Sequence, residues 1–118
     1  NQDRQIAEAK TAVLDMANAG YTRPVERKNI RVLGRQGLGM VYAGAYTMYS
    51  GKYISEHDKL ISEKLGYVLC GGDLSNKTLV SEQYLLNLER EAFLSLLGEK
   101  KTLERIQSIL TTGKPLRN

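Results

Sequence analysis

The sequence is poor in the residues that build metal centres and disulfide frameworks. Its 118 residues include one cysteine, Cys70, and one histidine, His57. A single thiol cannot form an internal disulfide, and one cysteine with one histidine cannot supply the four ligands of a structural zinc site. Cys70 ends the apolar run GYVLC, so we interpret it as a small buried hydrophobic residue. We expect neither a metal site nor a disulfide in this chain.

Long apolar runs are missing as well, as is tryptophan. No stretch approaches the roughly 18 apolar residues that a membrane-spanning helix needs. The N-terminal region shows no secretory signal pattern, so we predict a cytoplasmic protein without a membrane span. The first residue is Asn1 rather than methionine, which indicates a piece of a longer chain.

The net charge of +4 comes from the first half of the chain. Between Arg23 and Arg35 five basic residues face one acid, Glu26, whereas residues 54–118 carry equal numbers of each sign. Such a stretch is either a solvated loop or a contact for phosphate groups or an acidic partner. Nucleic acid is not favoured, because no aromatic–basic interleaving, recognition helix or zinc finger accompanies the charge.

Hydrophobic periodicity predicts an all-α, bundle-like fold of about five amphipathic helices with short loops. The expected helices cover residues 3–19, 36–49, 55–70, 81–97 and 101–110. No strand of useful length is predicted, although residues 30–33 are consistent with a short extended piece, and residues 72–78 are typical of a polar loop. We expect a single domain over 1–118, with a C-terminal helical pair at 81–112 and a basic tail at 113–118.

Capping residues support several of these boundaries. Asp3 is the expected N-cap of the first helix, and Gly20 follows its last turn. Ser55 with Asp58 resembles a capping box. The apolar positions form stripes; in the first helix they are Ile6, Ala9, Val13, Met16 and Ala17, and in the fourth Leu86, Phe93 and Leu97 widen the stripe to more than one side.

No catalytic constellation is predicted. His57 lies beside two acids in the first turn of a helix and is interpreted as a surface or capping residue. The segment GRQGLGMVYAG breaks the dinucleotide-binding pattern at Tyr42, so its glycines indicate close helix packing rather than an NAD site. Glu82, Glu89 and Glu91 are interpreted as solvated helix charges.

The basic tail leaves two alternatives. It contains Lys114, Pro115 and Arg117, and either cation can make a charge-assisted contact with a phosphate. The pattern alone favours a frayed terminus slightly over such a contact.

Three stretches resemble a known enzyme family: YISEHDKLISEKLGYVLCGGDL (53–74), VSEQYLLNLEREAFLSLLGEKKTLERIQSIL (80–110) and TGKPLRN (112–118). Together with AKTAVLDMANAGYTRP (9–24), they are similar to the C-terminal part of bacterial bifunctional 3-hydroxyacyl-CoA dehydrogenase/enoyl-CoA hydratases. Glu89 and Phe93 match the E-x-x-x-F helix of crotonase-type closing helices, and Lys114-Pro115 matches their final K-P. The glycine-rich segment departs from ordinary crotonase helices and fits the bifunctional subfamily only.

The resemblance implies a parent enzyme of fatty-acid β-oxidation, an oxidoreductase and lyase that uses NAD and acyl-CoA. Its catalytic elements lie upstream, so this chain alone is expected to hold no catalytic residue and no cofactor. By the same analogy, Lys114 is a candidate contact for the CoA phosphates. The expected partners are the remainder of the parent enzyme and further copies of the chain.

An alternative is an independent α-helical interaction or oligomerisation module without an enzymatic role. It is based on the amphipathic helices and the missing catalytic constellation. Both interpretations predict self-association of the isolated chain.

Overall fold

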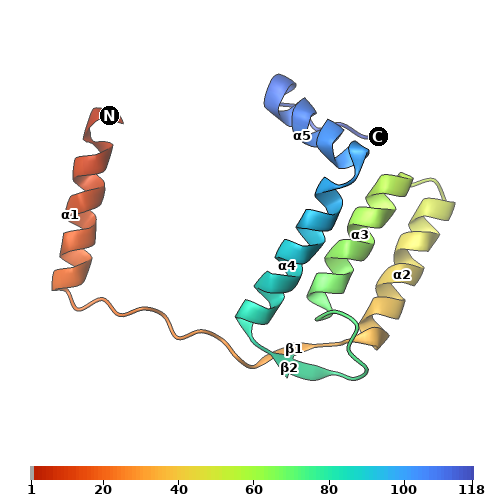
Figure 1. Ribbon diagram of the computed structural model, residues 1–118, viewed down its shortest axis with the longest axis horizontal. Helices are drawn as coiled ribbons and strands as arrows, with labels where there is room; N and C mark the ends of the chain where they lie inside the picture. Colours follow the sequence, from red (N-terminus) through yellow and green to blue (C-terminus); the bar gives the residue numbers. More distant parts are fainter. Residues whose placement is uncertain (1) are drawn as a thin grey trace.

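The computed structural model describes residues 2–118 and confirms the mostly helical class (Figure 1). A short 3-10 turn and five α-helices account for most of it, with one two-stranded ribbon. The elements are η1 (Gln2–Arg4), α1 (Gln5–Asn18), β1 (Ile30–Val32), α2 (Arg35–Ser50), α3 (Glu56–Leu69), β2 (Thr78–Val80), α4 (Glu82–Leu97) and α5 (Lys100–Thr112). Over these residues, no helix is both long and apolar enough to cross a membrane.

Helices α2, α3 and α4 lie side by side with α3 in the middle (Figure 1). Glycine permits the close approach of α3 to α2, because a Cβ at Gly66 would lie 2.9 Å from the Cβ of Val41. Gly37 on α2 similarly faces the Sγ of Cys70. Cys70 is buried, as predicted. The expectation of close packing holds for Gly37 but not for Gly39, whose surroundings within the chain are open.

The ribbon joins segments that are far apart in sequence. β1 pairs with β2 in antiparallel register, and Ile30 lies opposite Val80. β1 falls within the predicted extended piece, whereas β2 was not predicted. A three-residue strand is too short to show an alternating pattern, and its pairing is a long-range event. Beside the ribbon, Arg35 N–H donates to the carbonyl of Leu74, which fixes the start of α2.

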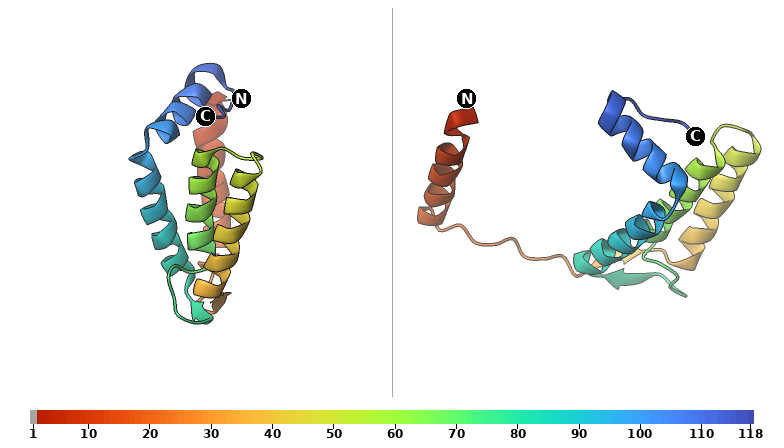
Figure 2. Two further views of the ribbon diagram at one scale, coloured as in Figure 1. Left: turned by 90° about the vertical axis from the view of Figure 1, so that its right-hand side faces the viewer. Right: turned by 45° about the horizontal axis from the view of Figure 1, so that its top comes forward.

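Helix α1 lies apart from the other four helices, at the end of an extended linker formed by residues 21–29 (Figure 1, Figure 2). None of its residues is buried. Its C-terminal end follows the prediction: Gly20 adopts φ +79° and Tyr21 N–H donates to the Met16 carbonyl at 3.0 Å. Its start does not, because η1 places Asp3 within a helical turn and makes Arg4 the N-cap.

The other helices have side-chain caps or glycine stops where the sequence indicates them. The amide of Asp58 donates to Ser55 Oγ at 3.1 Å, and the amide of Ser55 donates back to Asp58 Oδ2 at 3.0 Å. This is the predicted capping box of α3. Ser81 Oγ caps α4 by accepting from the Tyr84 amide at 3.0 Å, without a return bond, and Gly113 ends α5 in the left-handed conformation with φ +69°. Local sequence signals therefore set the ends of α3, α4 and α5 along the chain.

Candidate functional site

The basic tail is folded back along α5 instead of fraying. Ser108 Oγ donates to the carbonyl of Lys114 at 2.9 Å, which turns the chain at the end of the helix. Asn118 then donates to the carbonyl of Lys101 at 3.1 Å and to Glu104 Oε2 at 2.9 Å. The interpretation of residues 113–118 as a frayed terminus is therefore wrong. Long-range hydrogen bonds of Asn118 are the physical reason.

Arg105 connects the tail to α3. Its guanidinium donates to Asn118 Oδ1 at 2.7 Å and lies 2.9 Å from Asp58 Oδ1. The Ser55 amide, together with Arg105, holds the pKa of Asp58 below its usual range. One arginine thus joins the first turn of α3, the middle of α5 and the tail. This fixes the backbone from which Lys114 and Arg117 project.

His57 lies at the same junction and is buried, with only 4% of its surface exposed. Its Nε2 is 3.0 Å from the hydroxyl oxygen of Thr102 on α5. The interpretation of His57 as a surface residue is therefore wrong, because α5 covers the first turn of α3. The burial depends on packing between two helices that are 30 residues apart, which the local sequence does not show.

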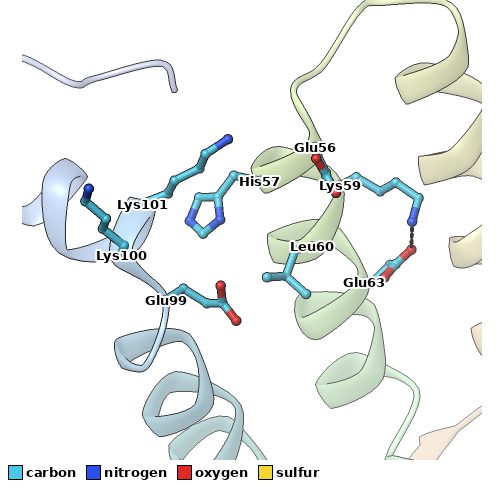
Figure 3. Close-up of a pocket in the computed structure, with 8 residues that line it drawn as sticks. All are labelled: Glu56, His57, Lys59, Leu60, Glu63, Glu99, Lys100 and Lys101. Carbon is cyan, nitrogen blue, oxygen red and sulfur yellow. Dashed lines mark hydrogen bonds and ion pairs between the residues drawn. The ribbon is translucent and has the colours of Figure 1, made fainter.

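A cavity of about 390 Å³ opens beside His57, between α3 and the start of α5 (Figure 3). Both lysine and glutamate side chains line it, and Lys59 pairs with Glu63 at 2.7 Å. Its lining consists of Glu56, His57, Lys59, Leu60, Glu63, Glu99, Lys100 and Lys101. Three lysines against three glutamates leave no excess of positive charge, so this cavity is not a built anion site.

The sequence-predicted basic residues do not come together. Lys114 is exposed on the tail, at the α5 end of the molecule, while the stretch from Arg23 to Arg35 lies at the opposite end, beside the ribbon (Figure 1). Arg35 is engaged by Asp73 at 2.6 Å, and this contact lowers the pKa of Asp73. Lys114 therefore remains a candidate phosphate contact on its own. In the described part of the chain, no three His, Cys, Asp or Glu residues are arranged to hold a metal ion.

An apolar groove runs between α3 and α4. It has a volume of about 470 Å³, and most of its lining is aliphatic or aromatic. Leu65 on α3 and Phe93 on α4 are 58% and 53% exposed. The predicted second apolar side of α4 is therefore present, and Phe93 and Leu86 belong to it. The sequence pattern on α4 signalled this surface, but only the structure shows that α3 provides its other wall.

Comparison with known proteins gives one informative result. The chain is 46% identical over all 118 residues to a protein of Bacillus subtilis (strain 168) named Probable 3-hydroxyacyl-CoA dehydrogenase. The similarity covers this whole chain. It spans only 15% of the length of that relative. No family model matches the chain, and no solved structure matches it.

The match supports the dehydrogenase part of the resemblance recognised in the sequence. The chain corresponds to a small part of a larger relative named as an enzyme. The five helices contain no assembled catalytic group among residues 2–118, and the apolar groove faces outward.

Proposed function

We propose that the chain is the C-terminal helical region of a fatty-acid β-oxidation enzyme that combines 3-hydroxyacyl-CoA dehydrogenase and enoyl-CoA hydratase activities. The observation that carries the proposal is the 46% identity over the entire chain to a small part of a 3-hydroxyacyl-CoA dehydrogenase. The crotonase-like closing motif, with Glu89, Phe93 and Lys114-Pro115, supports the hydratase assignment. In this proposal NAD and the reacting groups belong to the remaining polypeptide, and the protein is cytoplasmic.

Within that enzyme the region has a packing and assembly role. The support is the large apolar surface that the five helices leave exposed, including the α3–α4 groove. Surfaces of this kind mark interaction sites in soluble proteins. The remaining polypeptide and further copies of the chain are the proposed partners.

Lys114 is proposed to contact the phosphates of acyl-CoA. Its main chain is fixed by Ser108 and by the hydroxyl of Thr112, which accepts from the Lys114 amide at 3.1 Å. The ammonium group is exposed at the end of α5, where its flexible stem can reach the phosphates of acyl-CoA. The tail thus presents a positive charge from a fixed backbone.

A calorimetric titration with crotonyl-CoA at low and moderate salt tests the role of Lys114. We expect saturable binding that Lys114→Ala weakens by about tenfold, the value of one hydrogen bond between charged groups. Lys77→Ala is the matched control, because Lys77 is an exposed lysine on a loop. Absence of binding, or an equal loss in both variants, would remove Lys114 from the CoA contact and leave the region a packing role.

The alternative function is an independent interaction module without enzyme parentage. The same exposed groove favours it, because a docking surface does not require a catalytic neighbour. Saturable crotonyl-CoA binding that depends on Lys114 would argue against this alternative.

A further inference from the structure

Helix α1 presents an apolar stripe that the rest of the chain leaves uncovered. Ile6 and Val13 are 84% and 64% exposed, and Met16 continues the same face. Glu8 and Asp15 lie on the opposite side of the helix at 3.6 residues per turn. A separated face of this kind is typical of a helix that packs against an apolar surface.

The α3–α4 groove is an apolar surface that also lacks a partner within the described chain. The side chains that form it are Ile61, Leu65, Leu69, Leu86, Phe93 and Leu96. Charged side chains, Lys64, Glu82 and Glu89, also line it. The groove and the α1 stripe are thus two uncovered apolar surfaces of the same chain.

The two surfaces match in size and charge. α1 has 14 residues, about 21 Å of helix, and α4 has 16 residues, about 24 Å. Alanines at 9 and 17 within the stripe allow a close approach to the groove. Lys10 flanks the stripe, and the groove carries Glu82 and Glu89 against the single cation Lys64, so an excess of negative charge in the groove lies opposite that lysine.

The linker directs α1 away from the groove of its own chain. Residues 21–25 have no regular secondary structure, and Pro24 fixes its own φ and favours an extended conformation at Arg23. The linker is then fastened at its far end, where Glu82 N–H donates to the Arg27 carbonyl at 2.8 Å and Gln83 N–H donates to Glu26 Oε1 at 3.2 Å. Helix α1 and its linker, which we call the arm, therefore start beside the Glu82 end of the groove but extend outward from it (Figure 2).

We propose that α1 of one copy docks into the α3–α4 groove of a second copy, and that the second copy returns the same contact. Two-fold symmetry would make the two contacts identical, as in a dimer that exchanges one element between its copies. The proposal deepens the self-association part of the proposed function and does not depend on the Lys114 contact. Two contacts of about 400 Å² on each surface would bury about 1,600 Å², the size of a standard stable interface.

Cross-linking between differently labelled copies tests the exchange. Chains with Cys70→Ala and Val13→Cys are mixed with tagged chains that carry Cys70→Ala and Leu65→Cys, and a short bismaleimide is added. We expect a covalent product that contains one chain of each kind. Glu8→Cys, on the opposite face of α1, is the matched control and should give little of this product. Equal yields of the mixed product from Val13→Cys and Glu8→Cys would overturn the proposal.

The double variant Val13→Cys with Leu65→Cys, again with Cys70→Ala, distinguishes exchange from docking within one chain. A cross-linked species of dimer mass supports exchange. A cross-linked species of monomer mass would mean that each arm occupies its own groove and would overturn the proposal.

Light scattering of the full 118-residue chain separates failure of this inference from failure of self-association. We expect a dimer that Val13→Asp weakens by at least about 100-fold, because each dimer would then bury two unpaired carboxylates. A Val13→Asp chain that dimerises as tightly as the wild type would overturn the exchange but keep self-association. A wild-type monomer at high concentration would overturn both the exchange and self-association. It would leave the interpretation of the crotonyl-CoA titration unchanged.

Discussion

Helices α1 and α3 have the same length, 14 residues, yet they differ in almost every contact. α3 has a side-chain capping box, a close glycine contact with α2 and an arginine bridge to α5. α1 has no side-chain cap and no buried residue. An isolated helix of this length is marginal in water, because nucleation is costly and packing supplies most helical stability. The comparison teaches that α3 is stabilised by contacts within the chain, whereas α1 finds no packing surface among the described residues.

The largest effect is expected from the glycine that brings α2 and α3 together. Gly66→Ala should lower the free energy of unfolding by about 1–3 kcal/mol, because the new methyl group overlaps the β-branched Val41. Urea denaturation measures this change in the free energy of unfolding. Gly44→Ala on α2 is the control, since nothing lies within 4 Å of its added Cβ. It should stabilise the chain by about 0.5–1 kcal/mol through helix propensity. Equal effects of the two substitutions would show that the close packing of α3 is unimportant.

A smaller effect is expected from the caps. Ser55→Ala should lower the free energy of unfolding by about 1 kcal/mol, because the Asp58 amide loses its acceptor. Arg4→Ala, at the N-cap of α1, should change it by less than about 0.5 kcal/mol, since Arg4 makes no cap hydrogen bond there. Urea denaturation of both variants makes the comparison. A loss of equal size at Arg4 would mean that α1 is as firmly anchored as α3.

The smallest effect concerns pH. The Ser55 amide, together with Arg105, holds the pKa of Asp58 below its usual range, so its carboxylate stabilises the fold above about pH 4, and this stabilisation is lost as the pH falls through the folded pKa. Asp58→Asn should therefore make the urea midpoint less dependent on pH between about pH 5 and pH 2. Asp15→Asn on the exposed α1 is the control for removal of one negative charge. Identical profiles for wild type and Asp58→Asn would contradict the role of the carboxylate.

Local signals in the sequence predicted the helices well. Ser55 with Asp58, Ser81 and Gly113 act within a few residues of themselves, so their patterns carry the helix boundaries directly. The second apolar side of α4 was also predicted from the sequence, because Phe93 and Leu86 fall outside the main apolar stripe of that helix. These features depend on helical periodicity and not on how the helices are arranged.

The contacts that build the candidate site depend on arrangement and were missed. His57 became buried through Thr102, and the tail became ordered through Asn118 and Arg105. β2 formed only because β1 lies beside it. No local sequence pattern predicts such pairings. Each partner alone is an ordinary polar side chain or a very short extended segment. The CoA contact of Lys114 and the single-domain organisation of residues 1–118 stay predictions.

The linker anchor has a mechanical consequence. Glu26 and Arg27 are bonded to the first turn of α4, and three residues later the same chain enters β1 and then α2. Tension applied to α1 therefore does not dissipate in a loose tether but is transmitted to the first turn of α4 and to the ribbon. A force on α1 therefore acts on the rest of the chain through the anchor at residues 26 and 27. A partner that binds α1 is thereby connected to α4 through two hydrogen bonds at the linker anchor.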